Sequence, residues 1–373
     1  MSEQRKAILI RCCANDFQDA LNLFQALSDL SAPVYFVYVG EVLPNGVPPH
    51  IARRIILINV DFLKRTGLYT PRLDLAALTW QCGDLALYAA YERVQAEYFW
   101  IIEPDVYASP EIAANLFSAP LQAAIYAPLL RSEGEGWYFY DGTRKYFTEV
   151  WTCIFCLLAI RRDVLPELRQ RRADILAAWS DTDERAQLLP NDEAFVCSFL
   201  HAHGHACADL NSLGRFYTKR SIRFSMPVSR KSLELRRDAQ RLIHHPVCAG
   251  AFFEYKFRQR FADFGASYTT VHDYFVEREL LPIAPLVDQM TVVGYLLFVQ
   301  PRATWRNLNW RTHNLVKAAP GFLLHHLGRV KRRVLKRLPD SLVKRLPYPI
   351  GPRPAAAQEA SENPDLLANH RSR

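Results

Sequence analysis

Two acidic side chains follow an apolar run in the first half of the chain. Residues 98–102 are apolar or aromatic throughout, the pattern of a strand buried on both faces, and Glu103 and Asp105 come next, separated by Pro104. Proline has no amide hydrogen for a sheet ladder, so we expect the strand to end there. Two carboxylates this close repel each other unless a cation lies between them. The pattern therefore predicts a divalent-metal site; the alternative is that Glu103 caps a helix or pairs with a base while Asp105 begins a turn.

Two other spacings could also bind a metal, but we interpret both as structural. Cys153 and Cys156 lie in the apolar run 151–158, and an odd separation on a strand points two thiols to opposite faces. No second pair of ligands follows them, so we expect core cysteines, in the scattered distribution that is typical of reduced, cytosolic thiols. The alternating histidines of 201–205 span the expected end of a helix and a glycine turn, so their rings have no reason to converge.

These candidate residues need a scaffold, and strands alternate with helices along the first 250 residues. Strands are expected at 7–13, 34–42, 54–60, 98–102, 124–130, 151–160 and 206–210. Helices are expected at 20–27, 85–94 and 194–200, and Gly204 is a natural C-cap for the last of them. Short connections between alternating elements predict an α/β fold with a doubly wound, mostly parallel sheet. Ligands bind outside the carboxyl ends of the strands in such sheets, which is where the two acids fall.

From residue 80 onward the chain resembles the GT-A-fold glycosyltransferases, which use nucleotide-sugar donors. The resemblance is carried by Trp80-Gln81-Cys82-Gly83-Asp84, by the helix after it and by the run that ends in the two acids. Glu103-Pro104-Asp105 is similar to the metal motif of the family, DxD, in a looser E-x-D form. The resemblance implies a GT-A-like sheet and a Mn²⁺ or Mg²⁺ ion that Asp105, assisted by Glu103, holds against the diphosphate of the donor. Hard oxygen ligands suit either ion.

Two further stretches resemble site residues of the family. Asp192-Glu193 resembles its acidic motif at the N-terminus of a helix. This implies that Glu193 is the base that deprotonates the acceptor hydroxyl and that Asp192 is its acidic neighbour. Asp192 is also suited to N-cap the helix, and the two roles are compatible. The pair His244-His245 resembles the C-terminal histidine that many members add to the metal or diphosphate site, and we assign His245 to that role.

Three residues are assigned to donor binding within this resemblance. Arg11 lies near the carboxyl end of the expected first strand, and Trp80 and Asp84 bound the family-like run. Asp84 is also placed to cap the helix that begins at residue 85.

An aromatic and glycine-containing loop over 131–142 is expected to bind the acceptor. Its glycines predict mobility, and Trp137 and Tyr138 offer flat faces for a sugar or a lipid-linked acceptor. Trp151, from the following run, is assigned with them; the alternative is a surface loop stapled by its aromatic residues. The stretch 149–153 departs from the family pattern, because it has no glycine where the family has one.

The net charge of +8 is concentrated in one segment. Between residues 322 and 346 eight Lys or Arg oppose one acid, so the rest is nearly neutral and offers no basic footprint for nucleic acid. Apolar residues recur there at helical spacing opposite the basic face, which predicts a helix on an anionic membrane surface. Docking on the protein's own core and contact with RNA are the alternatives. No apolar run approaches the roughly 20 residues of a transmembrane helix, and the first residues lack a secretory leader.

These patterns divide the chain into four parts. We expect a catalytic domain over 1–250, a helical extension packed on it over 251–320, a basic amphipathic tail over 321–350 and a disordered end over 351–373. The resemblance implies a metal-assisted, inverting transfer of a sugar to a hydroxyl group of a membrane-proximal, lipid-linked or polysaccharide acceptor. The expected location is the cytoplasm or the inner face of the membrane.

Two other functions fit parts of the pattern. A nucleotidyltransferase or a metal-dependent phosphohydrolase would need a phosphate loop rich in glycine and basic residues after the first strand, whereas 11–15 has no glycine and one basic residue. A non-catalytic, membrane-associated binding protein would keep the sheet and lose turnover. The loose E-x-D motif and the missing glycine leave that alternative open.

Overall fold

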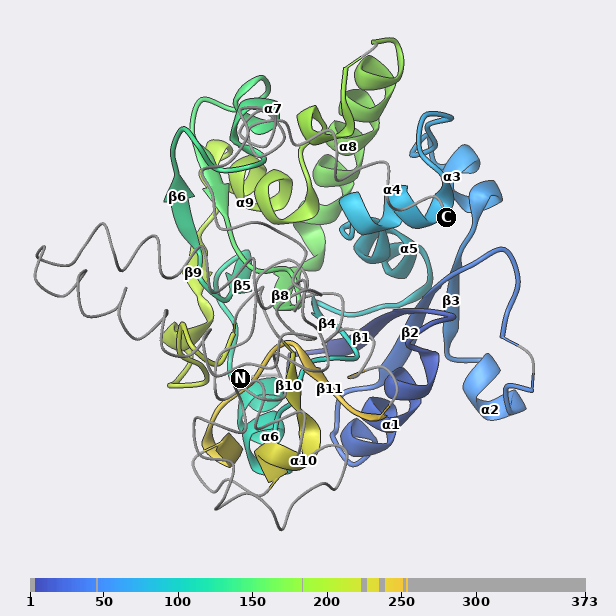
Figure 1. The fold of residues 1–373 in the computed structure, drawn as a ribbon, viewed down its shortest axis with the longest axis vertical. Helices are drawn as coiled ribbons and strands as arrows, with labels where there is room; N and C mark the ends of the chain where they lie inside the picture. The colour runs from blue at the N-terminus through green and yellow to red at the C-terminus, as the bar shows by residue number, and fades with distance from the viewer. Residues whose placement is uncertain are drawn as a thin grey trace, which may run out of the picture. The chain divides into compact units, whose positions relative to one another are not determined.

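A seven-stranded sheet forms the centre of the part of the chain that the structure describes. The structure is a computed structural model, and it describes residues 4–44, 46–182, 184–222, 227–234, 239–250 and 253. All of these belong to the first of two compact units into which the chain divides. Helices cover both faces of the sheet (Figure 1). The predicted α/β fold with a mostly parallel, helix-flanked sheet is therefore confirmed.

The strands lie in the order β3-β2-β1-β4-β8-β5-β9. Their bounds are β1 Lys6–Cys13, β2 Val34–Val39, β3 Ile55–Ile58, β4 Tyr98–Ile102, β5 Ile125–Ala127, β8 Leu157–Arg161 and β9 Cys207–Asp209. β1 to β4 are parallel and β5 is parallel to β9, whereas β8 is antiparallel to both β4 and β5. Because β8 is reversed, its first residues lie at the same edge of the sheet as the carboxyl ends of β1 and β4.

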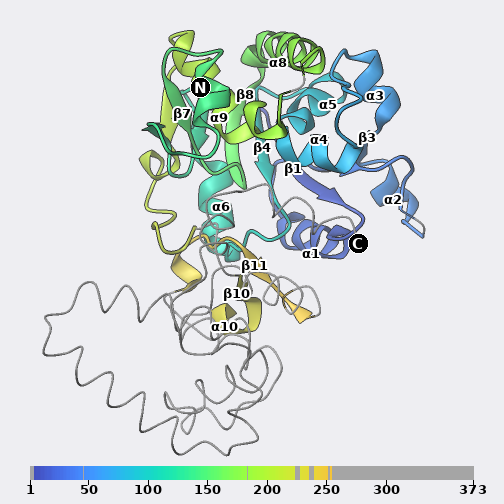
Figure 2. The same ribbon diagram turned by 45° about the horizontal axis from the view of Figure 1, so that its top comes forward.

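Two layers of helices enclose the sheet. The helices are α1 Phe17–Leu27, α2 Pro49–Ala52, α3 Val60–Arg65, α4 Leu75–Gln81, α5 Leu85–Arg93, α6 Pro110–Ser118, α7 Tyr140–Arg144, α8 Leu165–Ser180, α9 Asp192–Ala202 and α10 Arg230–Glu234. α1 and α6 lie on one face, and α5 and α8 lie on the other (Figure 2). The α1, α5 and α9 helices confirm the three predicted helices.

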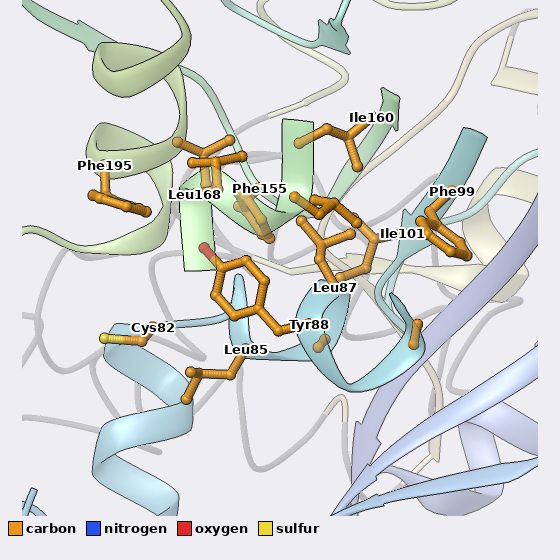
Figure 3. Close-up of a cluster of buried hydrophobic side chains, with 14 of the residues drawn as sticks. Cys82, Leu85, Leu87, Tyr88, Phe99, Ile101, Phe155, Ile160, Leu168 and Phe195 are labelled. Carbon is orange, nitrogen blue, oxygen red and sulfur yellow. The ribbon is translucent and has the colours of Figure 1, made fainter. Parts of the chain in front are cut away.

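The core divides into two clusters because side chains alternate along the strands. Ala7 and Leu9 of β1 pack in the cluster that includes α5, α8 and α9, whereas Ile8 and Ile10 pack in the cluster with α1 and α6. Every residue of Tyr98–Ile102 is buried, as the apolar pattern predicted for a strand covered on both faces. Figure 3 shows part of the first cluster, to which β4, α5, β8, α8 and α9 contribute side chains.

The prediction of one strand over 151–160 is wrong, because two strands lie there. β7 spans Val150–Thr152, and β8 begins only at Leu157. The four residues between them are buried and include no glycine or polar residue that would mark a break. Cys153 and Cys156 lie in this connection and pack in different core clusters, so the prediction of core cysteines is confirmed.

The prediction of a loop over 131–142 is wrong in part. β6 spans Arg131–Glu133 and pairs antiparallel with β7, and α7 begins at Tyr140. The polar residues of β6 are exposed or half-buried, whereas Val150 and Thr152 of its partner β7 are buried.

The last described elements include a second small sheet. β10 (Val228–Ser229) and β11 (Val247–Cys248) pair in parallel. Apart from Phe253, the predictions for 251–320, 321–350 and 351–373 fall outside the described residues. Among the helices that the structure does describe, none is both long enough and apolar enough to cross a bilayer.

Candidate active site

Glu103, Asp105 and His245 converge at the carboxyl edge of the sheet. Each offers one ligand atom, and these atoms lie within 4.8 Å of one another. The two acids follow β4 directly, and the amide of Val247 donates to the carbonyl oxygen of Asp105 at 2.6 Å, which brings the histidine segment to them. His245 Nε2 lies 3.4 Å from Glu103 Oε2 and 3.4 Å from Asp105 Oδ1. In the described part of the chain, this is the one group of three such side chains placed to hold a metal ion.

The charges in this cluster oppose one another. Burial disfavours a charged imidazole, but the Cys156 sulfur and the Asp105 carboxylate beside the ring outweigh burial and raise the pKa of His245 well above its ordinary value. Burial also disfavours a charged Glu103, but Arg11 first and His245 second outweigh burial and lower the pKa of that carboxyl. The carboxylates on either side therefore favour the charged form of the imidazole.

The donor set of this cluster fits a divalent cation such as Mn²⁺ or Mg²⁺. It offers two carboxylate oxygens and one imidazole nitrogen, and such cations accept carboxylate ligands readily. The side chains of Glu103, Asp105 and His245 are 21%, 14% and 11% exposed, so a ligand could reach the group from solvent. Coordination by His245 requires that the ring lose its proton, because only a neutral imidazole binds a metal.

Arg11 joins this cluster to the second acidic pair. The register Ile10↔Ile102 sets Arg11 level with the residue that follows β4. The guanidinium donates from Nη2 to Glu103 and from Nη1 to Asp192 Oδ2, the second contact at 3.2 Å. These two carboxylates outweigh burial and raise the pKa of Arg11, whereas burial raises the pKa of Asp192 to about 7 against the opposing effect of that arginine. The acids from the two ends of the family-like region therefore meet, as their assignment to one site requires.

Gly83 makes room for this bridge. Its amide donates to Asp192 Oδ2 at 3.1 Å. A Cβ atom at this position would lie 1.5 Å from Arg11 Nη1 and 2.2 Å from Asp192 Oδ2, so no side chain fits while the ion pair is in place.

The helix α9 presents Glu193 at its N-terminus. Asn191 is the N-cap and accepts from the amide of Ala194 at 3.1 Å, so the prediction that Asp192 caps this helix is wrong by one residue. Glu193 accepts from the Phe155 amide at 3.5 Å and from Asn191 Nδ2 at 3.3 Å. Burial, followed by the charge of Asp192, raises the pKa of Glu193.

The C-terminal end of α9 agrees with the prediction that Gly204 ends this helix. Gly204 adopts a φ of +70°, the left-handed conformation that ends many helices. The amide of His205 then donates to the carbonyl oxygen of Leu200 at 3.0 Å.

The other two residues assigned to donor binding lie in different environments. Asp84 has no exposed surface, and Arg172 holds its carboxylate in an ion pair at 2.8 Å, so Asp84 does not contact a donor directly. Its side chain makes no capping hydrogen bond to α5, so the predicted cap is wrong. Trp80 lies on α4 and is 66% exposed.

The aromatic residues assigned to the acceptor lie around β6, β7 and α7. Tyr138 is 59% exposed, and the Trp137 ring lies 5.6 Å from that of Phe139. Trp151 stacks on His201 at 4.2 Å between ring centroids. The structure thus brings these aromatic residues to neighbouring elements.

Sequence reasoning missed the parts of the site that depend on contacts between distant segments. It assigned Arg11 to the donor, and it gave no role to Gly83 or Arg172. The signal that could have found Gly83 is its place inside the family-like run 80–84. Cys156, next to His245, was assigned to the core alone.

Comparisons with known proteins give only distant similarity. No protein-family model matches the chain, and no curated protein matches it in sequence. The galactosyltransferase LgtC, solved with donor and acceptor sugar analogues, is 10% identical, with a TM-score of 0.39, over 73% of this chain and 95% of that chain. The glycosyltransferase GlyE of Streptococcus pneumoniae TIGR4 is 9% identical, with a TM-score of 0.36, over 74% of this chain and 64% of that one.

A third solved structure, a glycosyltransferase involved in the glycosylation of the major capsid of PBCV-1, is 10% identical. It has a TM-score of 0.32 over 68% of this chain and 98% of that one. All three are glycosyltransferases, and their TM-scores below 0.5 indicate only a distant similarity in fold. What the fold and the site define is an α/β protein with an acid and imidazole cluster at the carboxyl edge of its sheet.

Proposed function

We propose that the chain is a glycosyltransferase that moves a sugar from a nucleotide-sugar donor to a hydroxyl group of an acceptor. The observation that carries the proposal is the convergence of Glu103, Asp105 and His245, with Arg11 linking them to the acids of α9. A donor diphosphate needs positive charge, an acceptor hydroxyl needs a base, and this edge of the sheet offers residues for both. The resemblance of Glu103-Pro104-Asp105 to the E-x-D form of the family motif agrees with this assignment.

Asp105, with Glu103 and His245, would hold a Mn²⁺ or Mg²⁺ ion. When bound, such an ion neutralises charge that develops on the diphosphate leaving group. Arg11 keeps the Glu103 carboxylate fixed at the cluster, and His245 lies close enough to both acids to share a ligand with them. The site residues thus bring the cation and the donor phosphates to one place.

Glu193 would accept the proton of the attacking hydroxyl. Its raised pKa makes it a stronger base than an ordinary carboxylate once it is ionised. A base that faces the acceptor on the far side of the sugar from the leaving group would support a single displacement, so the course proposed with Glu193 in this role is inverting.

The test is binding of nucleoside diphosphates with and without Mn²⁺, followed by a donor screen for product. We expect metal-dependent binding to the wild type that Asp105→Ala abolishes. Asp163→Ala is the matched control, because Asp163 is 64% exposed and pairs only with its neighbour Arg161 in the described structure. Absent binding, or binding that Mn²⁺ and Asp105→Ala leave unchanged, would contradict the proposal.

A non-catalytic binding protein is a second candidate. Arg11 and His245 of the chain itself already contact the carboxylates of Glu103 and Asp105. The stretch 149–153, which lacks the glycine of the family, agrees with this alternative. Nucleotide binding that needs no metal, together with no product from any donor, would support the second candidate.

The proposed acceptor is lipid-linked or otherwise close to a membrane, and the protein is proposed to be cytoplasmic or peripheral on the inner face. This part rests on the sequence alone: eight basic residues against one acid between residues 322 and 346. Sedimentation with liposomes that contain anionic lipid tests it. The full chain should sediment, and a chain that ends at Pro320 should not; equal partitioning of the two would contradict the membrane contact.

A further inference from the structure

A buried ion pair between Arg172 and Asp84 contacts the segment that leads into α9. Arg172 of α8 donates from Nε and Nη2 to the two carboxylate oxygens of Asp84, at 2.9 and 2.8 Å. Neither side chain has any exposed surface. Removing two charges from water carries a desolvation cost that their attraction often fails to recover, so stability alone does not explain the pair.

Arg172 also holds the segment that leads into α9. Its Nη1 donates to the carbonyl oxygen of Pro190 at 2.7 Å. Its guanidinium lies 3.9 Å from the centroid of the Phe195 ring. Pro190 and Phe195 stand on either side of Asp192 and Glu193 in the chain. One side chain therefore fixes the start of α9 both before and after its two acids.

Asp84 lies next to a second residue that binds Asp192. Its neighbour Gly83 provides the amide that donates to Asp192 Oδ2. Tyr88, one turn along α5, donates its hydroxyl to Asp84 Oδ2 at 2.7 Å, and its ring is packed in the core cluster drawn in Figure 3. Tyr88 of α5 and Arg172 of α8 therefore both bind the carboxylate of Asp84. Their contacts also restrain the adjacent amide of Gly83.

We infer that Asp84 and Arg172 are positioning residues for Glu193, the candidate base, and for Asp192, which links that base through Arg11 to the metal ligands. The inference rests on the proposed function for what Glu193 does, but not for how its segment is held. Neither residue of the pair can touch a substrate, because both are fully buried. Loss of the pair should therefore act on the base directly and on the metal cluster only through Arg11.

The kinetic test uses the full-length protein with the double substitution Asp84→Leu and Arg172→Met, which removes both charges and leaves neither unpaired. A displacement of the base should lower kcat about 10- to 100-fold while the KM for the donor changes less than about twofold. Arg169→Met is the matched control, because Arg169 lies on the same helix and contacts Glu92 at the surface. The control should keep the wild-type kcat.

A second measurement does not depend on turnover. The amides of Gly83 and Ala194, which bond to Asp192 and Asn191, should exchange hydrogen at least about tenfold faster in the double variant than in the wild type or in Arg169→Met. If both amides stay as protected as in the wild type, the inference is overturned, whatever the activity. If they exchange faster while kcat is unchanged, the pair is structural only, and the inference is again overturned.

The two proposals can fail separately. A wild type that transfers sugar from no donor overturns the proposed function alone, and hydrogen exchange then decides whether the pair positions the two acids. If the double variant does not fold, Arg172→Lys takes its place, because lysine keeps the charge but cannot bind Asp84 and Pro190 together. Faster exchange and a lower kcat in that variant support the inference, and wild-type values overturn it.

Discussion

At saturating metal, where His245 has already lost its proton to the ion, the ionisation of Glu193 should set the pH dependence of transfer. Burial, followed by the charge of Asp192, raises the pKa of Glu193 to about 8. A base must be ionised to accept a proton, so we expect the rate to rise with pH up to this value and to level off above it. Glu193→Gln should lower kcat about 10²- to 10⁴-fold and remove the rise. The pH–rate profiles of the two proteins measure both effects.

Glu167→Gln provides the control for this profile. Glu167 is exposed in the first turn of α8. The control should keep the wild-type profile. If Glu193→Gln keeps it as well, Glu193 is not the base.

Gly83 should tolerate no side chain while the site is assembled. In Gly83→Ala the new Cβ would overlap Arg11 Nη1 and Asp192 Oδ2, so the ion pair must separate. We expect a loss of about 1–3 kcal/mol in the free energy of unfolding, the usual cost of forcing a group into a packed site. Urea unfolding measures this loss, and activity should fall with it.

Gly134→Ala is the matched control, because a Cβ there meets no atom within 4 Å. It should leave the unfolding free energy unchanged. Equal unfolding free energies for the two alanine variants would show that the space around Gly83 adapts without breaking the ion pair.

At the scale of elements, the cap of α9 makes a prediction about stability. Asn191→Ala removes the bond to the Ala194 amide and the contact with Glu193. Loss of an N-cap should lower the free energy of unfolding by about 1 kcal/mol, which thermal or urea unfolding can detect. Asn191→Ser should restore most of it, because serine caps helices as well as asparagine does and adds no charge beside Glu193.

Asn115→Ala is the control for this change, because Asn115 is an exposed position within α6. Alanine is the better helix former there, so stability should stay the same or rise. A loss at Asn115 equal to that at Asn191 would mean that the cap contributes nothing of its own.

Elements with strong local patterns could be predicted from the sequence, and those without could not. β4 was found because an unbroken apolar run ends at a proline, and α9 because apolar residues recur at helical spacing before Gly204. The break between β7 and β8 was missed, because 153–156 is apolar and buried like the strands beside it. The direction of β8 depends on its pairing with β4 and β5, which a local pattern does not contain.

Asp84 shows how a distant contact overrides a local preference. Its position before α5 favours capping, a contact within the same segment. Arg172, 88 residues away in sequence, binds the carboxylate instead. The buried guanidinium of Arg172 needs an ionised partner. If the Asp84 carboxylate capped α5 instead, the guanidinium would lose that partner.

At the scale of the whole molecule, the site exists only because four distant segments fold together. Arg11, Glu103, Asp192 and His245 come from β1, the end of β4, α9 and the segment before β11. The sequence predicted that the acids and His245 share a cleft from a family resemblance, but not the ionic bridge through Arg11. That bridge depends on the register of β1 against β4 and on where α9 begins.

Because its ligands come from separate segments, a bound metal ion should stabilise the whole fold and not one element. An ion that binds only the folded chain stabilises it by about 2.7 kcal/mol at a hundred times its Kd. For a domain of this size that corresponds to a rise of about 5–10 °C in Tm, measured by thermal unfolding with and without Mn²⁺. Asp105→Ala should remove the rise, and Asp163→Ala should keep it. A rise of equal size in Asp105→Ala would mean that Mn²⁺ binds elsewhere on the protein and would remove the main support for a metal-assisted reaction at this edge of the sheet.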